Sequence, residues 1–144
     1  MSLYIDTSCL LKLLLAEPES ARVDEIVKSE PKVVVSSLTR VEALVRFQAR
    51  FNARLLTRSG VESVIAGFET LLKLPPFEVQ RCPSTLMEDA ENQLHPIIQS
   101  TYCRTLDRLH LAAMTSFGLK RLLTNDDAQA RAAKAIGLHV IMPR

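Results

Sequence analysis

Short apolar runs alternate along the chain with longer stretches in which apolar residues recur at helical spacing. The runs at residues 3–5, 32–37, 75–83 and 138–141, and one that ends near Thr124, predict strands. Strands that alternate with helices are typical of βαβ units, so we expect a parallel sheet with helices on its faces. The predicted helices cover residues 7–29 with a break at Pro18, 38–56, 57–74, 84–100 as far as Pro96, 105–117, and an Ala-rich segment that ends at Gly137.

Residues 39–74 hold two helical segments in succession and are predicted to form a helix hairpin that projects from the sheet. The pattern Ser59-x-x-Glu62 predicts a capping box at the start of the second helix. The hairpin carries more apolar residues than one helix pair can bury against a small sheet, which predicts a homodimer surface. These residues are Phe47, Phe51, Val61, Val64, Ile65 and Phe68.

Composition indicates an ordinary soluble domain. The length of 144 residues is typical of one domain, which we expect to cover residues 1–144. The apolar runs are too short for a bilayer, and the N-terminus lacks the pattern of a secretory signal. Three cysteines at wide spacing suit reduced thiols, so we expect a cytoplasmic protein without a membrane segment. A net charge of +2 allows a polyanionic partner only through a local basic patch.

Four acids stand where predicted strands or loops meet helices. Asp6 and Asp126 follow the carboxyl ends of predicted strands, and Glu42 and Asp107 fall in the first turns of predicted helices. In a sheet with right-handed crossovers these junctions gather along one edge, so the four acids could share one pocket.

Each acid also has a purely structural explanation. Asp6 and Asp126 could be turn or helix-cap residues, Thr39-x-x-Glu42 matches a capping box, and Asp107 would favour its helix dipole. Both interpretations stay open at this point. A shared pocket would require a cation between the like charges, and hard oxygen donors favour Mg²⁺ or Mn²⁺ over zinc.

Four segments together resemble the PIN-domain ribonucleases and, among them, the VapC-type toxins of bacterial and archaeal toxin–antitoxin pairs. The segments are YIDTSCLLKLLL, SSLTRVEALVR, RTLDRLHLAAM and LLTNDDAQARAAKAIGLHVI, and they stand in the family's order from end to end of the chain. The resemblance implies a PIN-like three-layer α/β/α fold with a central parallel sheet. It also implies that Asp6, Glu42 and Asp107 match the family's three most constant acids and Asp126 the more variable fourth.

The function implied by the resemblance is a Mg²⁺- or Mn²⁺-dependent endoribonuclease that acts as a toxin, with Asp6, Asp107 and Asp126 as metal ligands and a cognate antitoxin as partner. The alternative is a PIN-fold module that binds RNA or protein without cleaving it. Asp127 adds a second acid beside Asp126, so either of the two could be the one that reaches the metal. Arg108 follows Asp107 at a position where the family frequently has a small residue, so the chain differs from the common pattern there.

Other residues are candidates for supporting roles. Thr7, Ser8 and Thr124 could contact substrate or hold the acids, although helix capping would also explain them. His110 is interpreted as a core residue outside the site. A basic stripe along the first hairpin helix could contact RNA or an acidic antitoxin, or could be a solvated face in which Arg46 pairs with Glu42. It consists of Arg46, Arg50, Arg54 and Arg58.

Overall fold

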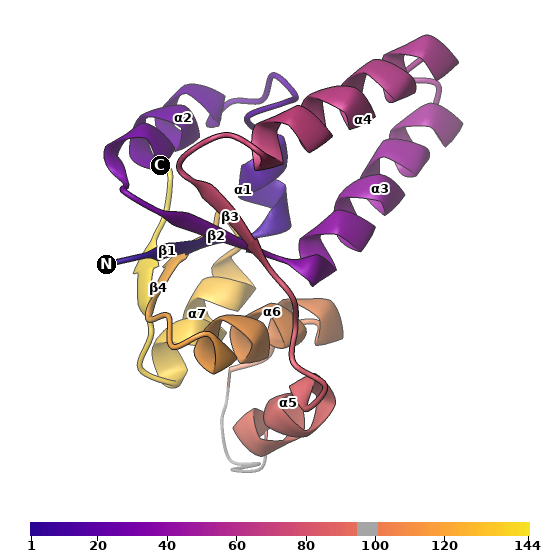
Figure 1. Ribbon diagram of the computed structural model, residues 1–144. Coiled ribbons are helices and arrows are strands. Elements are labelled where there is room, and N and C mark those ends of the chain that lie inside the picture. The colour runs from indigo at the N-terminus through magenta and orange to yellow at the C-terminus, as the bar shows by residue number, and fades with distance from the viewer. Residues whose placement is uncertain (95–100) are drawn as a thin grey trace.

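One sheet of parallel strands forms the centre of the computed structural model, which describes residues 1–94 and 101–144 (Figure 1). Within these residues the strand order is β3-β2-β1-β4-β5, and each neighbouring pair is parallel. The predicted parallel sheet is therefore confirmed, including the strand ending near Thr124. The strands are β1 (Leu3–Ile5), β2 (Val33–Ser36), β3 (Phe77–Gln80), β4 (Arg121–Leu123) and β5 (His139–Ile141).

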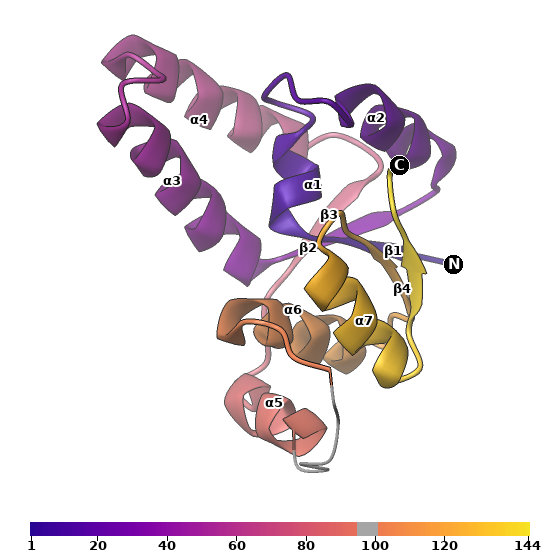
Figure 2. The same cartoon turned by 180° about the vertical axis from the view of Figure 1, so that it is seen from behind.

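Helices cover both faces of the sheet and complete the expected three layers (Figures 1 and 2). One face carries α1, α2 and the α3–α4 pair, and the other carries α6 and α7. The helix predicted as far as Pro96 ends within the described residues at Leu94, and Pro96 itself lies outside them. The helices are α1 (Thr7–Leu11), α2 (Ser20–Ser29), α3 (Ser37–Asn52), α4 (Arg58–Leu72), α5 (Leu86–Leu94), α6 (Thr105–Ser116) and α7 (Asp127–Ala135).

Alternate residues of the central strands point into separate cores. Leu3 and Ile5 pack with the helices of the first face, whereas Tyr4 packs with α6 and α7 on the second face. Leu123 and Leu122 divide in the same way on β4. Successive side chains of a strand point to opposite faces, and burial of both explains why these strands are almost wholly apolar.

The predicted hairpin is formed by α3 and α4, which project from the sheet side by side (Figures 1 and 2). Phe47 and Phe68 join the two helices through an edge-to-face contact with ring centroids 6.0 Å apart. The predicted capping box at Ser59 is wrong. Thr57 is the N-cap of α4, and its side chain accepts a hydrogen bond from the Gly60 N–H at 3.1 Å.

The strand order positions a crevice at one edge of the sheet. The chain passes from β1 to β2 and β3 on one side, and later to β4 and β5 on the other side of β1. A topological switch point therefore lies between β1 and β4, and open α/β sheets bind ligands beyond the carboxyl ends of strands at such a point. Asp6 and Asp126 lie beyond these two strand ends. Among the described residues, no helix is both long and apolar enough to cross a membrane.

Candidate active site

Four acids distant in sequence line one small pocket at this edge of the sheet. We call it the acidic pocket. It has a volume of about 70 Å³. The acids come from the β1–α1 junction, from α3, from α6 and from the β4–α7 junction. The lining residues are Asp6, Thr7, Ser8, Glu42, Arg46, Arg104, Asp107, His110 and Asp126.

Asp6 is both a helix cap and a wall of the acidic pocket. Its Oδ1 accepts a hydrogen bond from the Cys9 N–H at 2.9 Å, as an N-cap residue does. Its Oδ2 accepts hydrogen bonds from Thr124 Oγ1 at 2.9 Å and from Ser8 Oγ at 3.0 Å. The side chain is almost fully buried, and burial raises the pKa of Asp6 despite these hydrogen bonds. The structural and functional explanations of Asp6 are therefore compatible.

Asp126, not Asp127, faces the acidic pocket. Asp126 is the N-cap of α7 and accepts a hydrogen bond from the Gln129 N–H at 2.7 Å. Asp127 instead pairs with Arg144, whose Nη1 lies 3.0 Å from its Oδ1, and this contact lowers the pKa of Asp127. Arg144 also donates to the Asn125 side chain and backbone oxygen, each at 3.0 Å, and so holds the loop before α7.

Glu42 reaches the acidic pocket from the second turn of α3, so its predicted place in the first turn is wrong. The N-cap of α3 is Ser36, and no capping box forms at Thr39. Burial raises the pKa of Glu42, but hydrogen bonds to His110 and Thr7 outweigh this effect and leave the pKa below its usual value.

His110 is a buried core residue as predicted, but it also lines the acidic pocket, from which the prediction excluded it. Its Nε2 lies 2.8 Å from Glu42 Oε1, and its Nδ1 lies 2.6 Å from the hydroxyl of Tyr4. Tyr4 in turn donates to Ser36 Oγ at 2.8 Å, and burial raises the pKa of Tyr4. A buried row of hydrogen bonds therefore runs from β2 through Tyr4 and His110 to Glu42.

Asp107 shares a cation with Asp126. Arg104 Nε donates to Asp107 Oδ2 at 3.1 Å, and Arg104 Nη2 lies 3.9 Å from Asp126 Oδ2. Thr124 is not among the residues that line the pocket, but its hydroxyl donates a hydrogen bond to the Asp6 carboxylate. Sequence reasoning missed Arg104, although its position three residues before Asp107 in a predicted helix start was a usable signal. Tyr4 carried no comparable signal, because it looks like any other buried strand residue.

The donor set fits a hard cation, although the present arrangement does not close around one. Within residues 1–94 and 101–144, no three acidic, histidine or cysteine side chains are arranged to hold a metal ion. The guanidinium of Arg104 stands between two of the carboxylates instead. Carboxylate oxygens line the pocket without any thiolate, and this is the donor chemistry of Mg²⁺ and Mn²⁺.

The predicted basic stripe is not continuous. Arg46 lines the acidic pocket from α3, and Arg50 pairs with Glu17 at 3.3 Å. Arg54 follows the end of α3 with a φ of 60°, and Arg58 belongs to α4, where it lies 3.9 Å from Glu62. The chain reverses direction between the two helices, so the spacing of four residues does not keep these arginines on one face.

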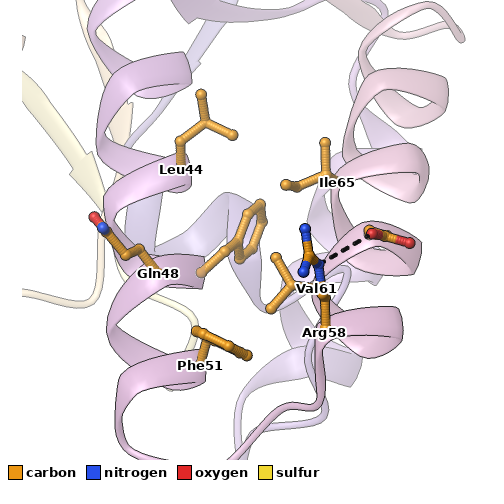
Figure 3. Close-up of a pocket in the computed structure, with 8 residues that line it drawn as sticks. Leu44, Gln48, Phe51, Arg58, Val61 and Ile65 are labelled. Carbon is orange, nitrogen blue, oxygen red and sulfur yellow. Dashed lines mark ion pairs between the residues drawn. The ribbon is translucent and has the colours of Figure 1, made fainter.

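A second cavity lies along the hairpin, and we call it the hairpin groove. It has a volume of about 410 Å³ and is mainly apolar. Figure 3 shows Leu44 and Phe51 on one helix facing Val61 and Ile65 on the other. Phe47 and Phe68 are fully buried, so they do not add to an exposed surface as expected, but Phe51 is 46% exposed. The groove is lined by Leu44, Phe47, Gln48, Phe51, Arg58, Val61, Glu62 and Ile65.

Comparison with known proteins identifies the family to which this fold belongs. The family model described as PIN domain matches residues 3–135. The chain therefore belongs to the PIN-domain family. Ribonuclease VapC46 of Mycobacterium tuberculosis is 32% identical over 144 residues, which cover 99% of this chain and 98% of that protein.

Solved structures share the same fold at lower sequence identity. The crystal structure of M. tuberculosis VapC20, described as a Sarcin-Ricin loop cleaving toxin, aligns with a TM-score of 0.68 and 16% identity. That alignment covers 94% of this chain and 95% of VapC20. A toxin–antitoxin complex from Klebsiella pneumoniae aligns with a TM-score of 0.63 and 16% identity, over 100% of this chain and 98% of the matched chain.

Proposed function

We propose that this protein is a Mg²⁺- or Mn²⁺-dependent endoribonuclease that hydrolyses RNA phosphodiester bonds as the toxin of a toxin–antitoxin pair. The observation that carries the proposal is the meeting of Asp6, Glu42, Asp107 and Asp126 in one pocket. Membership of the PIN-domain family and similarity over the whole chain to a protein named ribonuclease VapC46 support it.

Asp6, Asp107 and Asp126 are the residues that would hold the ion. A bound divalent ion lowers the pKa of a water molecule and neutralises charge on the phosphodiester. The Cys9 N–H and Thr124 fix the rotamer of the Asp6 carboxylate, and α7 fixes that of Asp126 by capping. Such outer contacts keep ligand oxygens in place before substrate arrives.

Glu42 has a separate role in this proposal. His110 holds one carboxylate oxygen of Glu42, and the lowered pKa keeps the group ionised near neutral pH. An ionised Glu42 can accept a hydrogen bond from the attacking water and orient it toward the phosphorus. Thr7 and Ser8 line the same pocket, and Arg46 carries positive charge for the RNA backbone beside it.

The size of the pocket favours flexible RNA. A cavity of about 70 Å³ is reached more readily by the backbone of a flexible single strand than by that of a rigid A-form duplex. We expect faster cleavage of hairpin loops than of blunt duplexes, measured with end-labelled oligonucleotides. Equal rates on both substrates would contradict this preference.

The hairpin groove supports a protein partner. Exposed apolar residues on α3 favour a homodimer, and the groove suits an apolar segment of a cognate antitoxin. Light scattering tests the homodimer, and a strictly monomeric mass at micromolar concentration would contradict it.

All three cysteines are free thiols, and two of them are buried, which supports a cytoplasmic location.

The deciding experiment measures cleavage of single-stranded RNA with Mg²⁺ or Mn²⁺, after chelation, and after restoring the metal. We expect cleavage that stops with the chelator and returns with the ion. RNA binding without cleavage under all three conditions would contradict the enzyme and support the silent binding module.

A further inference from the structure

Arg104 occupies an unusual place for an exposed arginine. It is the N-cap residue of α6, and its side chain is 66% exposed, yet its guanidinium lies against two carboxylates of the acidic pocket. The distances are 3.1 Å from Nε to Asp107 Oδ2 and 3.9 Å from Nη2 to Asp126 Oδ2. These acids come from different elements, so a single side chain links the α6 and α7 sides of the pocket.

The charges around Arg104 explain this position. Carboxylates that converge in a partly buried pocket repel one another unless a cation lies between them. Among the residues that line the pocket, the permanent cations are Arg46 and Arg104, and of these two it is Arg104 that forms ion pairs with Asp107 and Asp126. An arginine cannot relieve this contact by losing a proton, so it leaves the carboxylates only by turning its side chain away.

Arg104 and a divalent ion compete for the same carboxylates, because each places a positive charge against Asp107 and Asp126. Mg²⁺ requires near-octahedral oxygen ligands at about 2.0–2.1 Å, and a guanidinium nitrogen at 3.1 Å from Asp107 Oδ2 occupies the approach to that oxygen. The exposed stem of Arg104 gives the side chain room to turn outward. A divalent ion that binds these carboxylates repels the guanidinium, so we expect its entry to displace Arg104 outward.

We infer that Arg104 is the built-in counter-ion of the acidic pocket, which competes with the divalent ion for Asp107 and Asp126 and so sets the metal concentration at which the site fills. This inference rests on the proposed function, because it takes these carboxylates as metal ligands. It gives Arg104 a positioning role in the metal-free protein and a tuning role in metal affinity.

The test is a calorimetric titration of the purified protein with Mn²⁺, comparing wild type with Arg104→Gln. Loss of the competing charge should tighten Mn²⁺ binding about two- to fivefold, the ratio expected for an ion pair of ordinary surface strength. The same variant should have a lower melting temperature without metal, because the carboxylates lose their counter-ion. A purely structural Arg104 would lower the melting temperature and leave Mn²⁺ affinity unchanged.

Two further variants serve as controls. Arg40→Gln removes an ion pair with Glu69 on the hairpin and should leave Mn²⁺ affinity at the wild-type value. Arg104→Lys keeps the charge without the two-pronged guanidinium and should bind Mn²⁺ with intermediate affinity. Unchanged or weaker binding by Arg104→Gln, with wild type binding normally, would overturn the inference and leave the proposed function intact. Failure of wild type to bind Mn²⁺ would overturn both.

A second measurement uses the wild-type protein and Mg²⁺. The Arg104 Nε–H signal in ¹H–¹⁵N spectra, assigned by its loss in Arg104→Gln or Arg104→Lys, should shift as Mg²⁺ saturates the site. A signal that stays in place at saturation would overturn the exchange.

Discussion

The acidic pocket and the hairpin groove are built in opposite ways. The pocket gathers side chains from four segments spread over most of the chain, and it is polar and only about 70 Å³ in volume. The groove is formed by two successive helices, is mainly apolar and has a volume of about 410 Å³ (Figure 3). Catalysis needs charged groups that a rigid scaffold holds at fixed positions. Docking of a partner needs apolar area, which one hairpin can supply.

This difference predicts that the two cavities respond independently to mutation. Substitution of the acids of the pocket should alter chemistry with little loss of stability, because their like charges already oppose folding. Residues of the groove should alter stability or association and leave the chemistry intact.

The largest expected effect is on cleavage by Asp6→Asn. Loss of one metal-binding carboxylate removes several kcal/mol of transition-state stabilisation, so the cleavage rate should fall by about 10³-fold. Asparagine caps a helix as well as aspartate, so the metal-free variant should be as stable as wild type or more stable. Single-turnover RNA cleavage and thermal unfolding measure the two effects.

Metal-induced stabilisation gives the control for Asp6→Asn. Mn²⁺ should raise the wild-type melting temperature by mass action and raise that of the variant much less. A variant that cleaves RNA at the wild-type rate, with an unchanged metal-induced shift, would remove Asp6 from the active site.

The next largest effect is on the free energy of unfolding, and it should differ between Phe47 and Phe51 of the groove. Phe47 is fully buried against Phe68, so Phe47→Ala should lower the free energy of unfolding by about 3 kcal/mol or more. Phe51 is half exposed, so Phe51→Ala should cost about 1 kcal/mol or less and should weaken self-association instead. Urea unfolding and light scattering measure these changes, and similar unfolding energies for the two variants would contradict the assignment of core and surface.

A smaller effect is expected for Tyr4→Phe, which removes the hydroxyl between Ser36 and His110. The free energy of unfolding should fall by about 1–2 kcal/mol, because buried partners lose a hydrogen bond. The turnover rate should fall more than the apparent affinity for RNA, since Glu42 loses the residue that orients it through His110. A variant with wild-type turnover would show that the hydrogen-bonded row serves folding alone.

The smallest effect is the pH dependence that Asp6 adds to the stability of the metal-free protein. The pKa of Asp6 is raised in the folded state above its ordinary value of 3.8, so the folded state binds more protons than the unfolded state just above that pH. Stability should therefore fall as pH rises from about 4 through the raised pKa. The lowered pKa of Glu42 changes stability with pH in the opposite direction, but it does so in both wild type and Asp6→Asn. Subtracting the stability curve of Asp6→Asn from that of wild type therefore isolates the contribution of Asp6. Parallel curves for the two proteins would contradict a pKa of Asp6 that burial raises in the folded state.

Local patterns in the sequence were sufficient for the strands and most helices. Apolar runs located β1, β2 and β4, and the rule that crevices form at strand ends placed Asp6 and Asp126 together. Such predictions succeed because a strand buried on both faces must be apolar and its carboxyl end must open into a loop. The caps were less predictable: Thr57 and Ser59 are both suitable N-cap residues and only Ser59 has a glutamate three residues later, yet Thr57 is the N-cap of α4.

The sequence by itself determined which elements form and which acids stand at their ends, because burial and periodicity act over a few residues. Only the tertiary structure showed that Asp126 lines the pocket while Asp127 pairs with the distant Arg144. The same holds for His110, which contacts Glu42 from another helix, and for Arg104, which links two acids on different elements. Folding alone brings together groups distant in sequence, so no local pattern could have assigned the contact of Arg104 with Asp126 or that of His110 with Glu42.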